Sequence, residues 1–300
     1  MGNWLIGPEI VQALADGAPV VALESALITH GMPAPLNLTV ARRLEAAVRE
    51  EGAVPATVAV LGGAACVGLN PAQLERLARE PVPAKVSLRD LPVVIAEGHT
   101  GGTTVAATMH LAHRAGIRVF ATGGIGGVHR GHLEDVSADL VALASIPIVV
   151  VCAGAKAILD LPRTLERLET VGVPVVGYGT DAFPAFISRS SGLPVSARAD
   201  TPEEVAEIAR VRDGLELQAA LLVCVPVPAE TELDWEEAQA EIEATVLEAD
   251  AQGIGGNDLT PFLLGRLAER TQGRSRVANE ALLLNNARVA ARIARALGAQ

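Results

Sequence analysis

Aromatic side chains are scarce in this sequence: Phe, Trp and Tyr make up 2% of its 300 residues. So few rings leave little material for a surface that stacks nucleic-acid bases. Basic residues are also outnumbered, 24 against 35 acidic ones, which gives a formal net charge of -11. Most of such a surface would repel a phosphate backbone. The sequence therefore predicts no nucleic-acid partner, and an anionic small substrate would need a local cluster of donors.

Long apolar runs are absent too. The longest, Ile146–Ala153, suits a buried strand and is far too short to span a membrane. The first residues lack the basic and apolar segments of a secretion signal. The three cysteines, Cys66, Cys152 and Cys224, are too far apart for a zinc site and lie in apolar runs, as buried thiols in a reducing compartment do. We expect a cytoplasmic protein without membrane contact.

Lysine is the rarest charged residue. The chain contains 22 Arg but only two Lys, Lys85 and Lys156. Where Arg serves almost every need for positive charge, a retained lysine suggests chemistry that a guanidinium cannot perform, such as imine formation or loss of a proton. Chance retention is the alternative reading for each of the two.

Apolar runs and amphipathic segments alternate along most of the chain. Short, mostly β-branched runs predict strands at Val20–Leu23, Thr57–Leu61, Val93–Ala96, Arg118–Ala121, Ile146–Cys152, Pro174–Tyr178 and Ala219–Val225. Periods near 3.6 between them predict helices at Leu38–Glu51, Thr104–Ala115, Leu161–Val171 and Pro202–Gly214. Continuous apolar strands separated by helices are typical of a sheet buried on both faces. We therefore expect an α/β fold, a three-layer α/β/α sandwich around a central, largely parallel mixed sheet.

The C-terminal part contains no strand signal. Its periodicity predicts three helices, over Leu233–Gln252, Thr260–Thr271 and Ser275–Leu297. No repeat or long linker interrupts the chain, and a helical segment packed back on the sheet is the simplest arrangement. The sequence thus predicts a single domain over residues 1–300.

Two strand ends carry reactive side chains. Glu24 directly follows the apolar run Val20–Leu23, where burial would favour its protonated form and suit a general acid, although a helix cap or an ion pair explains such a Glu equally well. Lys156 follows the run Ile146–Cys152 between small residues that leave room for a ligand. Desolvation there favours the neutral amine, which is typical of a Schiff-base lysine.

Glycine-rich segments adjoin both positions. Glu97–Val105 precedes a helix and could bring backbone N–H groups to an anion, while Thr122–Gly131 could wrap a ligand, with His129 and Arg130 as donors. Asp135, Ser137 and Asp139 alternate with small residues just beyond. That spacing suits a hard divalent cation, a set of sugar hydroxyls or an ordinary helix N-cap.

Taken together, these segments resemble the pseudouridine-5'-phosphate glycosidases, a family that includes indigoidine synthase A-like proteins. The resemblance runs from about residue 20 to residue 297. It rests on the stretches VALESALITHGMP, GAVPATVAVL, KVSLRD, GHTGGTTVAATM, FATGGIGGVHRG, DVSADL, CAGAKAILDLPRTLE, VPVVGYGTDAFPAFISRSSG and GRSRVANEALLLNNARVAARIA.

The resemblance implies an enzyme that cleaves pseudouridine 5'-phosphate with water to uracil and ribose 5-phosphate, a carbon–oxygen lyase with glycosidase activity. Glu24 matches the family's acid–base residue and Lys156 the lysine that forms an imine with the ring-opened sugar. Asp135 matches the ligand of a divalent metal, Mn²⁺. The substrate contacts match Lys85, Val105, Ser137, Ala138 and Asp139. The family's assembly is a homotrimer, which the residues by themselves do not indicate.

Two other functions stay open at this point. A Schiff-base aldolase acting on another sugar phosphate would use the same Lys156. An inert nucleotide-binding module would bind such a ligand without turnover, and the presence of Glu24 and Lys156 argues against it. Release of uracil from pseudouridine 5'-phosphate separates the three.

Overall fold

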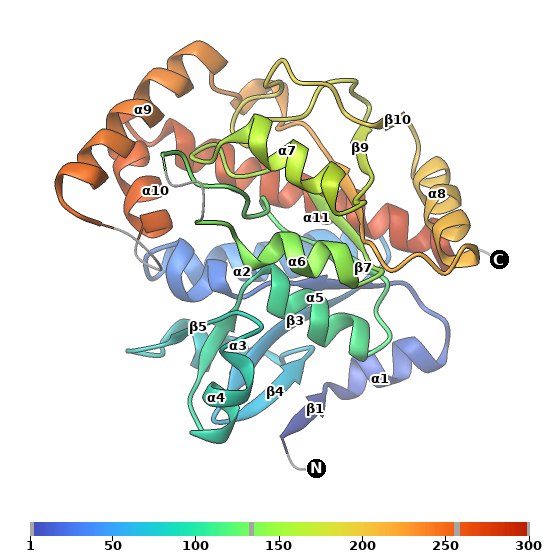
Figure 1. Ribbon diagram of the computed structural model, residues 1–300. Helices are drawn as coiled ribbons and strands as arrows, with labels where there is room; N and C mark the ends of the chain where they lie inside the picture. Colours follow the sequence, from blue (N-terminus) through green and yellow to red (C-terminus); the bar gives the residue numbers. More distant parts are fainter. Residues whose placement is uncertain (1–2, 132–134, 255–258, 299–300) are drawn as a thin grey trace.

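The protein is described by a computed structural model that covers residues 3–131, 135–254 and 259–298 (Figure 1). Within these ranges eleven strands form one sheet, with the order β1-β4-β3-β2-β7-β8-β11-β9-β10 and with β5 joined through β6 to β3. The strands are β1 (Trp4–Ile6), β2 (Val20–Leu23), β3 (Val54–Leu61), β4 (Ala64–Val67), β5 (Ala84–Val86), β6 (Gly101–Thr103), β7 (Val119–Ala121), β8 (Val149–Cys152), β9 (Val175–Tyr178), β10 (Ala197–Ala199) and β11 (Leu221–Cys224).

The sheet is mostly parallel. All pairs from β3 through β2, β7, β8, β11 and β9 to β10 are parallel, whereas β3 pairs antiparallel with β4 and β6. The mixed part therefore lies at one side of the sheet. This arrangement confirms the predicted α/β fold with a largely parallel mixed sheet.

Helices cover both faces of the sheet. They are α1 (Pro8–Ala15), α2 (Leu36–Glu50), α3 (Pro71–Ala78), α4 (Leu91–Ala96), α5 (Val105–Arg114), α6 (Ala138–Ser145), α7 (Leu161–Thr170), α8 (Pro202–Gly214), α9 (Trp235–Ala251), α10 (Leu259–Arg270) and α11 (Arg274–Gly298). On one face α11 packs against α2, α8 and strands β2, β7 and β8, while α5 and α6 lie on the other (Figure 1). The helices α9 and α10 pack against each other, and α10 also contacts α11. Among the described residues, no helix combines the length and apolar character needed to cross a membrane.

Several helices begin with an N-capping side chain and a proline in the first turn, as their sequences favour. The side chains of Asn70, Asp160 and Thr201 each accept a hydrogen bond from the backbone N–H three residues on, at 2.9, 3.1 and 3.2 Å. A proline stands in the first turn of each of these helices, α3, α7 and α8, where its missing N–H costs nothing. These caps fix where the strand-to-helix connections turn.

One predicted strand is wrong. Val93–Ala96 belongs to α4, a helix that starts at Leu91 with Pro92 in its first turn. A run of four apolar residues does not distinguish a strand from a buried helical turn, and Pro92 favours the helix start. The strand of this region is β6, formed by Gly101–Thr103 within the glycine-rich segment itself. The short strands β1, β4, β5 and β10 were not predicted either.

Candidate active site

Three neighbouring parallel strands end at the same edge of the sheet and deliver the site. Glu24 directly follows β2, Thr122 directly follows β7, and Lys156 comes four residues after the end of β8. Because β2, β7 and β8 are adjacent and parallel, the side chains beyond their carboxyl ends converge. The alternation of apolar runs with helices thus brings together residues more than a hundred positions apart.

Glu24 is half-buried and is hydrogen-bonded to Thr122, which follows the neighbouring strand β7. The hydroxyl of Thr122 donates a hydrogen bond to Oε1 of Glu24. Burial raises the pKa of Glu24 above its ordinary value, against the charge of Lys156, the hydrogen bond from Thr122 and the charge of Lys85, whereas Asp139 reinforces the rise. A carboxyl group in these surroundings keeps its proton at higher pH than usual and can act as a general acid.

Lys156 lies on a tightly folded loop. Its backbone N–H donates to the carbonyl of Ile125 at 3.1 Å, and the Ile125 N–H donates to the carbonyl of Gly154 at 3.1 Å. Gly154 has φ +81°, and a Cβ there would collide with the carbonyl oxygen of Pro184, so only glycine fits. Within the described residues, Nζ of half-buried Lys156 has no hydrogen-bond partner. The amine is therefore held in place by its backbone and stays available to a ligand.

Lys85 reaches the site from the mixed part of the sheet, where β5 pairs parallel with β6. It lies on β5 and pairs in register with Gly102 of β6. A Cβ on Gly102 would overlap Thr29 and the carbonyl of Ser25, so only glycine fits at this position. The Ser25 hydroxyl accepts from the Thr103 N–H at 2.9 Å and thereby holds β6 against the end of β2. The lysine is thus fixed beside Glu24.

Asp139 and Ser137 organise the backbone of the site. The buried Asp139 carboxylate accepts from the N–H of Ala106, at 3.0 Å, and from that of Gly126, at 2.8 Å. It joins the first turn of α5 to the glycine-rich loop after β7. Ser137 is the N-cap of α6 and accepts from the Asp139 N–H at 3.2 Å. One of the alternatives for this segment, a helix N-cap, is thus formed by Ser137.

These residues line two adjoining cavities. The larger one, of about 390 Å³, is here called the polar cavity; its walls include all eight predicted site residues, namely Glu24, Lys85, Val105, Asp135, Ser137, Ala138, Asp139 and Lys156. The smaller one, of about 80 Å³, is called the central cavity. Both contain Glu24, Lys85 and Lys156 in their walls. The structure therefore places the acid, the amine and the second lysine in the walls of both cavities.

Other lining residues were missed in the sequence. Asn279 of α11 and Phe186 line the central cavity, and Arg89 and Thr104 line the polar one. Thr104 precedes α5, and its buried hydroxyl has no hydrogen-bond partner among the described residues. Of these four residues, only Thr104 could be recognised in the sequence, as a hydroxyl residue at the start of a helix. The other three depend on contacts between distant segments.

Arg130, which the sequence suggests as a ligand donor, supports the backbone in this structure. Its guanidinium donates to the carbonyl oxygens of Leu159, at 3.1 Å, and Ala157, at 3.3 Å, and so braces the loop after Lys156. His129, in contrast, lines the polar cavity. The sequence identified both as donors but could not tell backbone support from ligand contact.

The family model for indigoidine synthase A-like proteins matches residues 9–296. The chain belongs to this family. A relative from Paracoccus denitrificans (strain Pd 1222), named pseudouridine-5'-phosphate glycosidase, is 58% identical over 296 residues, which cover 97% of each chain. One of the same name from Solibacter usitatus (strain Ellin6076) is 56% identical over 291 residues, 96% of this chain and 97% of the relative.

Solved structures of the family share the fold. The prealnumycin C-glycosynthase AlnA in complex with ribulose 5-phosphate superimposes with a TM-score of 0.92 at 40% identity, over 100% of this chain and 98% of AlnA. An indigoidine synthase A-like protein from Thermotoga maritima gives a TM-score of 0.90 at 40% identity, over 98% and 96% of the two chains. The indigoidine synthase A-like fold, including its helical C-terminal segment, is therefore the fold of this chain.

Proposed function

We propose that this chain is a pseudouridine-5'-phosphate glycosidase, which cleaves the C–C glycosidic bond of pseudouridine 5'-phosphate reversibly to uracil and D-ribose 5-phosphate. The observation that carries the proposal is that Glu24, Lys156 and Lys85 line the same two adjoining cavities. The names of relatives more than 50% identical over nearly the whole chain supply the substrate. Because water is added in cleavage and lost in synthesis, the activity belongs with the hydro-lyases.

Lys156 would supply the covalent step. A C–C glycosidic bond does not break by simple protonation of a leaving oxygen, so an electron sink is needed at C1'. The Lys156 amine attacks C1' as the C1'–O4' bond breaks, and its proton passes to O4'. The nitrogen lone pair then forms a C1'=N imine while the C1'–C5 electron pair passes to uracil. Water hydrolyses the imine, which releases ribose 5-phosphate and restores the amine.

Glu24 would handle the proton of the leaving base. Uracil C5 takes a proton as the C1'–C5 bond breaks and loses one in the synthetic direction. The raised pKa of Glu24, caused first by burial, keeps the acid form available for cleavage. Thr122 holds Oε1, which leaves Oε2 for the base. Asn279 also lines the central cavity and carries an amide donor that suits the C2 carbonyl of uracil, which lies opposite C5 on the ring.

The polar cavity is suited to the 5'-phosphate. Lys85 and Arg89 bring positive charge, and α5 starts at the cavity wall with Val105. The buried Thr104 hydroxyl, which has no hydrogen-bond partner among the described residues, is a further donor at this helix start. In a chain of net charge -11, this local set of donors is what an anionic substrate requires.

We propose Mn²⁺ as the metal. Among the described residues no three His, Cys, Asp or Glu side chains form a metal cluster, so an all-protein cage is not available there. Asp135 is exposed in the wall of the polar cavity, and one carboxylate completed by waters and phosphate oxygens suits a hard divalent cation. When bound, the ion would neutralise charge on the phosphate. The family resemblance also supports a homotrimer, which light scattering would test.

Uracil release by the purified protein tests the proposed function. With pseudouridine 5'-phosphate we expect stoichiometric uracil and ribose 5-phosphate, and from the two products the reverse reaction. Turnover of an aldol substrate without uracil release would favour a Schiff-base aldolase. Binding without any turnover would favour an inert nucleotide-binding module. Glu24→Gln is the matched control for contaminating glycosidases, because its shape is preserved while its proton chemistry is lost.

A further inference from the structure

A third cavity, here called the outer cavity, opens beside the catalytic residues. Its volume is about 310 Å³, against about 80 Å³ for the central cavity. The two share His30, Gly31, Phe186, Leu264 and Asn279 in their walls. They therefore adjoin each other. Neither Glu24 nor Lys156 lines the outer cavity, so it lies on the side of the central cavity away from these two residues.

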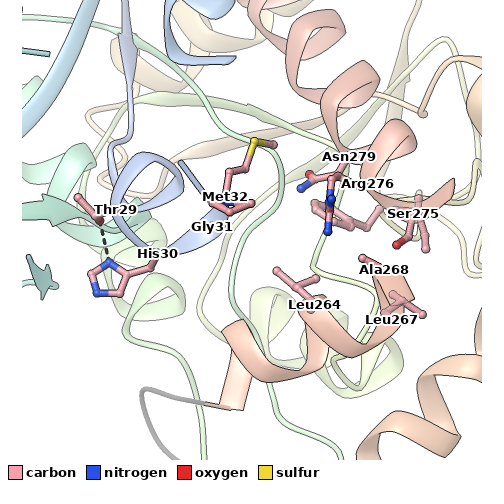
Figure 2. A pocket seen from close by; sticks show the side chains of 14 residues that line it. Thr29, His30, Gly31, Met32, Leu264, Leu267, Ala268, Ser275, Arg276 and Asn279 are labelled. Atoms are coloured by element: carbon pink, nitrogen blue, oxygen red, sulfur yellow. Dashed lines mark hydrogen bonds between the residues drawn. The ribbon is translucent and has the colours of Figure 1, made fainter. Parts of the chain in front are cut away.

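The outer cavity has mostly apolar walls with a polar edge. Met32, Leu267 and Ala268 are buried in its wall, and Leu264 and Phe186 adjoin them at the shared boundary. Figure 2 shows Met32 facing the start of α11, where Arg276 and Asn279 project, with Leu264 and Ala268 of α10 opposite them. Its volume is in the range of small-molecule sites. Such walls suit a flat or apolar group.

Phe186 marks the boundary of the two cavities. It has φ +64°, in the left-handed region that a bulky residue rarely adopts. Its backbone N–H donates to the carbonyl of Ala153 at 3.0 Å, so this conformation is fixed to the loop that carries Lys156. The ring is thereby held at the junction between the central and outer cavities. A strained residue fixed at a ligand boundary is typical of a functional position.

We propose that the outer cavity is a second aglycone subsite, which lets this chain form and cleave C–C bonds to nucleobases that carry an additional apolar or aromatic ring. The inference rests on the proposed function. Uracil needs C5 beside Glu24 and Lys156, and its ring occupies the central cavity. Substituents on the ring atoms remote from C5, N1 and N3, then extend toward Asn279 and Leu264 and enter the outer cavity.

The chemistry is unchanged by the larger base. In the synthetic direction the C1' of the ribose 5-phosphate imine bonds to C5 of the substituted uracil, and the C5 proton passes to Glu24. One water is lost overall, and no oxidant or reductant enters. The added ring contributes only contact with apolar walls, which stabilises binding in proportion to the area that it buries.

Synthesis with benzyl-substituted uracils tests the proposal. The purified protein is incubated with ribose 5-phosphate and uracil, 1-benzyluracil or 3-benzyluracil, and the C-nucleotides are measured by mass spectrometry. We expect at least one benzyluracil to react with a kcat/KM within about tenfold of uracil. If uracil reacts and neither benzyluracil does, the subsite is refuted. If uracil itself does not react, the proposed function fails instead.

Gly265 offers a matched pair of variants. It lies on α10 in the wall of the outer cavity, and a Cβ built on it meets no atom within 4 Å, so a side chain starts in open space. Replacing a helical glycine also favours the helix. Gly265→Trp should lower the ratio of kcat/KM for the benzyluracil to that for uracil at least tenfold, roughly the discrimination of a hydrophobic pocket. Gly265→Ala should keep the ratio. An unchanged ratio in both Gly265→Trp and Gly265→Leu would place the benzyl group elsewhere and overturn the inference.

Discussion

Asn286 of α11 donates its side-chain amide to the carbonyl oxygen of Thr122, with 2.9 Å between Nδ2 and the oxygen. Asn286 is completely buried, and its Oδ1 has no hydrogen-bond partner among the described residues. Thr122 in turn donates its hydroxyl to Glu24. The long C-terminal helix therefore fixes the end of β7 and, through Thr122, the orientation of the proposed general acid.

Asn286→Ala should lower kcat more than it raises KM, because it frees Thr122 and lets Glu24 leave its position. Loss of the buried hydrogen bond should also lower the free energy of unfolding by about 1–3 kcal/mol. The next residue, Asn285, makes no side-chain hydrogen bond within the described residues, so Asn285→Ala is the matched control. If Asn286 has only a structural role, the pH profile of kcat should not change in Asn286→Ala. If Asn286 positions Glu24, the part of the profile that is governed by ionisation of Glu24 should shift.

The stability of the protein should depend on pH through Glu24. Burial raises its folded-state pKa above the ordinary value of 4.5, so between these values the folded protein binds more protons than the unfolded chain. The free energy of unfolding then falls as pH rises through this window. Glu24→Gln removes the effect. At pH below the ordinary pKa, the variant and the wild type should have the same free energy of unfolding. At pH above the raised pKa of Glu24, the variant should be more stable.

Denaturant unfolding at a series of pH values measures this difference. A Glu24→Gln stability gain that is the same at every pH would show that the carboxyl group does not titrate as its burial demands. Activity provides the second readout: the variant should lose roughly 10²- to 10⁴-fold in kcat, the usual contribution of a general acid. A stable but inactive Glu24→Gln variant is therefore the expected outcome.

Much of this architecture could be predicted from the sequence because local patterns decide it. The apolar runs that become β2 and β8 are long enough to identify as buried strands, and Glu24 and Lys156 follow from their ends. Val93–Ala96 was assigned wrongly because four apolar residues fit a helical turn as well.

The contacts that complete the site could not be predicted in the same way. Asn286 reaches Thr122 across 164 positions of sequence, and no local pattern on an Ala- and Leu-rich helix distinguishes it from Asn285. The sequence suggests Arg130 as a ligand donor but does not show that it also donates to the carbonyls of Ala157 and Leu159. Which side chain supports the backbone and which faces the cavity depends on packing between segments.

Lys85→Arg should keep part of the activity. Lys85 is half-buried on β5 and lines both the polar and the central cavity, where it supplies positive charge for the phosphate. Arginine keeps the charge but not the compact shape, so KM should rise roughly tenfold while kcat changes less. Steady-state kinetics with pseudouridine 5'-phosphate measure both constants. Loss of imine formation in Lys85→Arg would instead mean that the roles of the two lysines had been exchanged.

Asp135→Ala should weaken Mn²⁺ binding without unfolding the protein. The side chain is exposed and the change creates no buried cavity, so stability should change by at most about 0.5 kcal/mol. The protein is first freed of metal with a chelator and is then titrated with Mn²⁺. The electron paramagnetic resonance signal of the free ion measures the affinity directly. We expect at least a tenfold loss in Asp135→Ala, together with a raised KM for the phosphorylated substrate. Equal Mn²⁺ affinity in the two proteins would show that Asp135 is not the metal ligand. Full activity of metal-free Asp135→Ala would show that the reaction does not need the metal.

Lys156 should form a covalent adduct with ribose 5-phosphate. The backbone of the loop is held by Ile125, and Nζ has no hydrogen-bond partner within the described part of the chain, so the amine can reach the aldehyde of the open sugar. Borohydride reduces the imine to a stable secondary amine, which peptide mass spectrometry locates. Lys156→Arg should give no adduct, because a guanidinium stays protonated and does not attack a carbonyl. Glu24→Gln should still give it, because capture of the sugar alone needs no proton transfer at the base. An adduct on Lys85, or none beside normal turnover, would exclude the covalent role of Lys156.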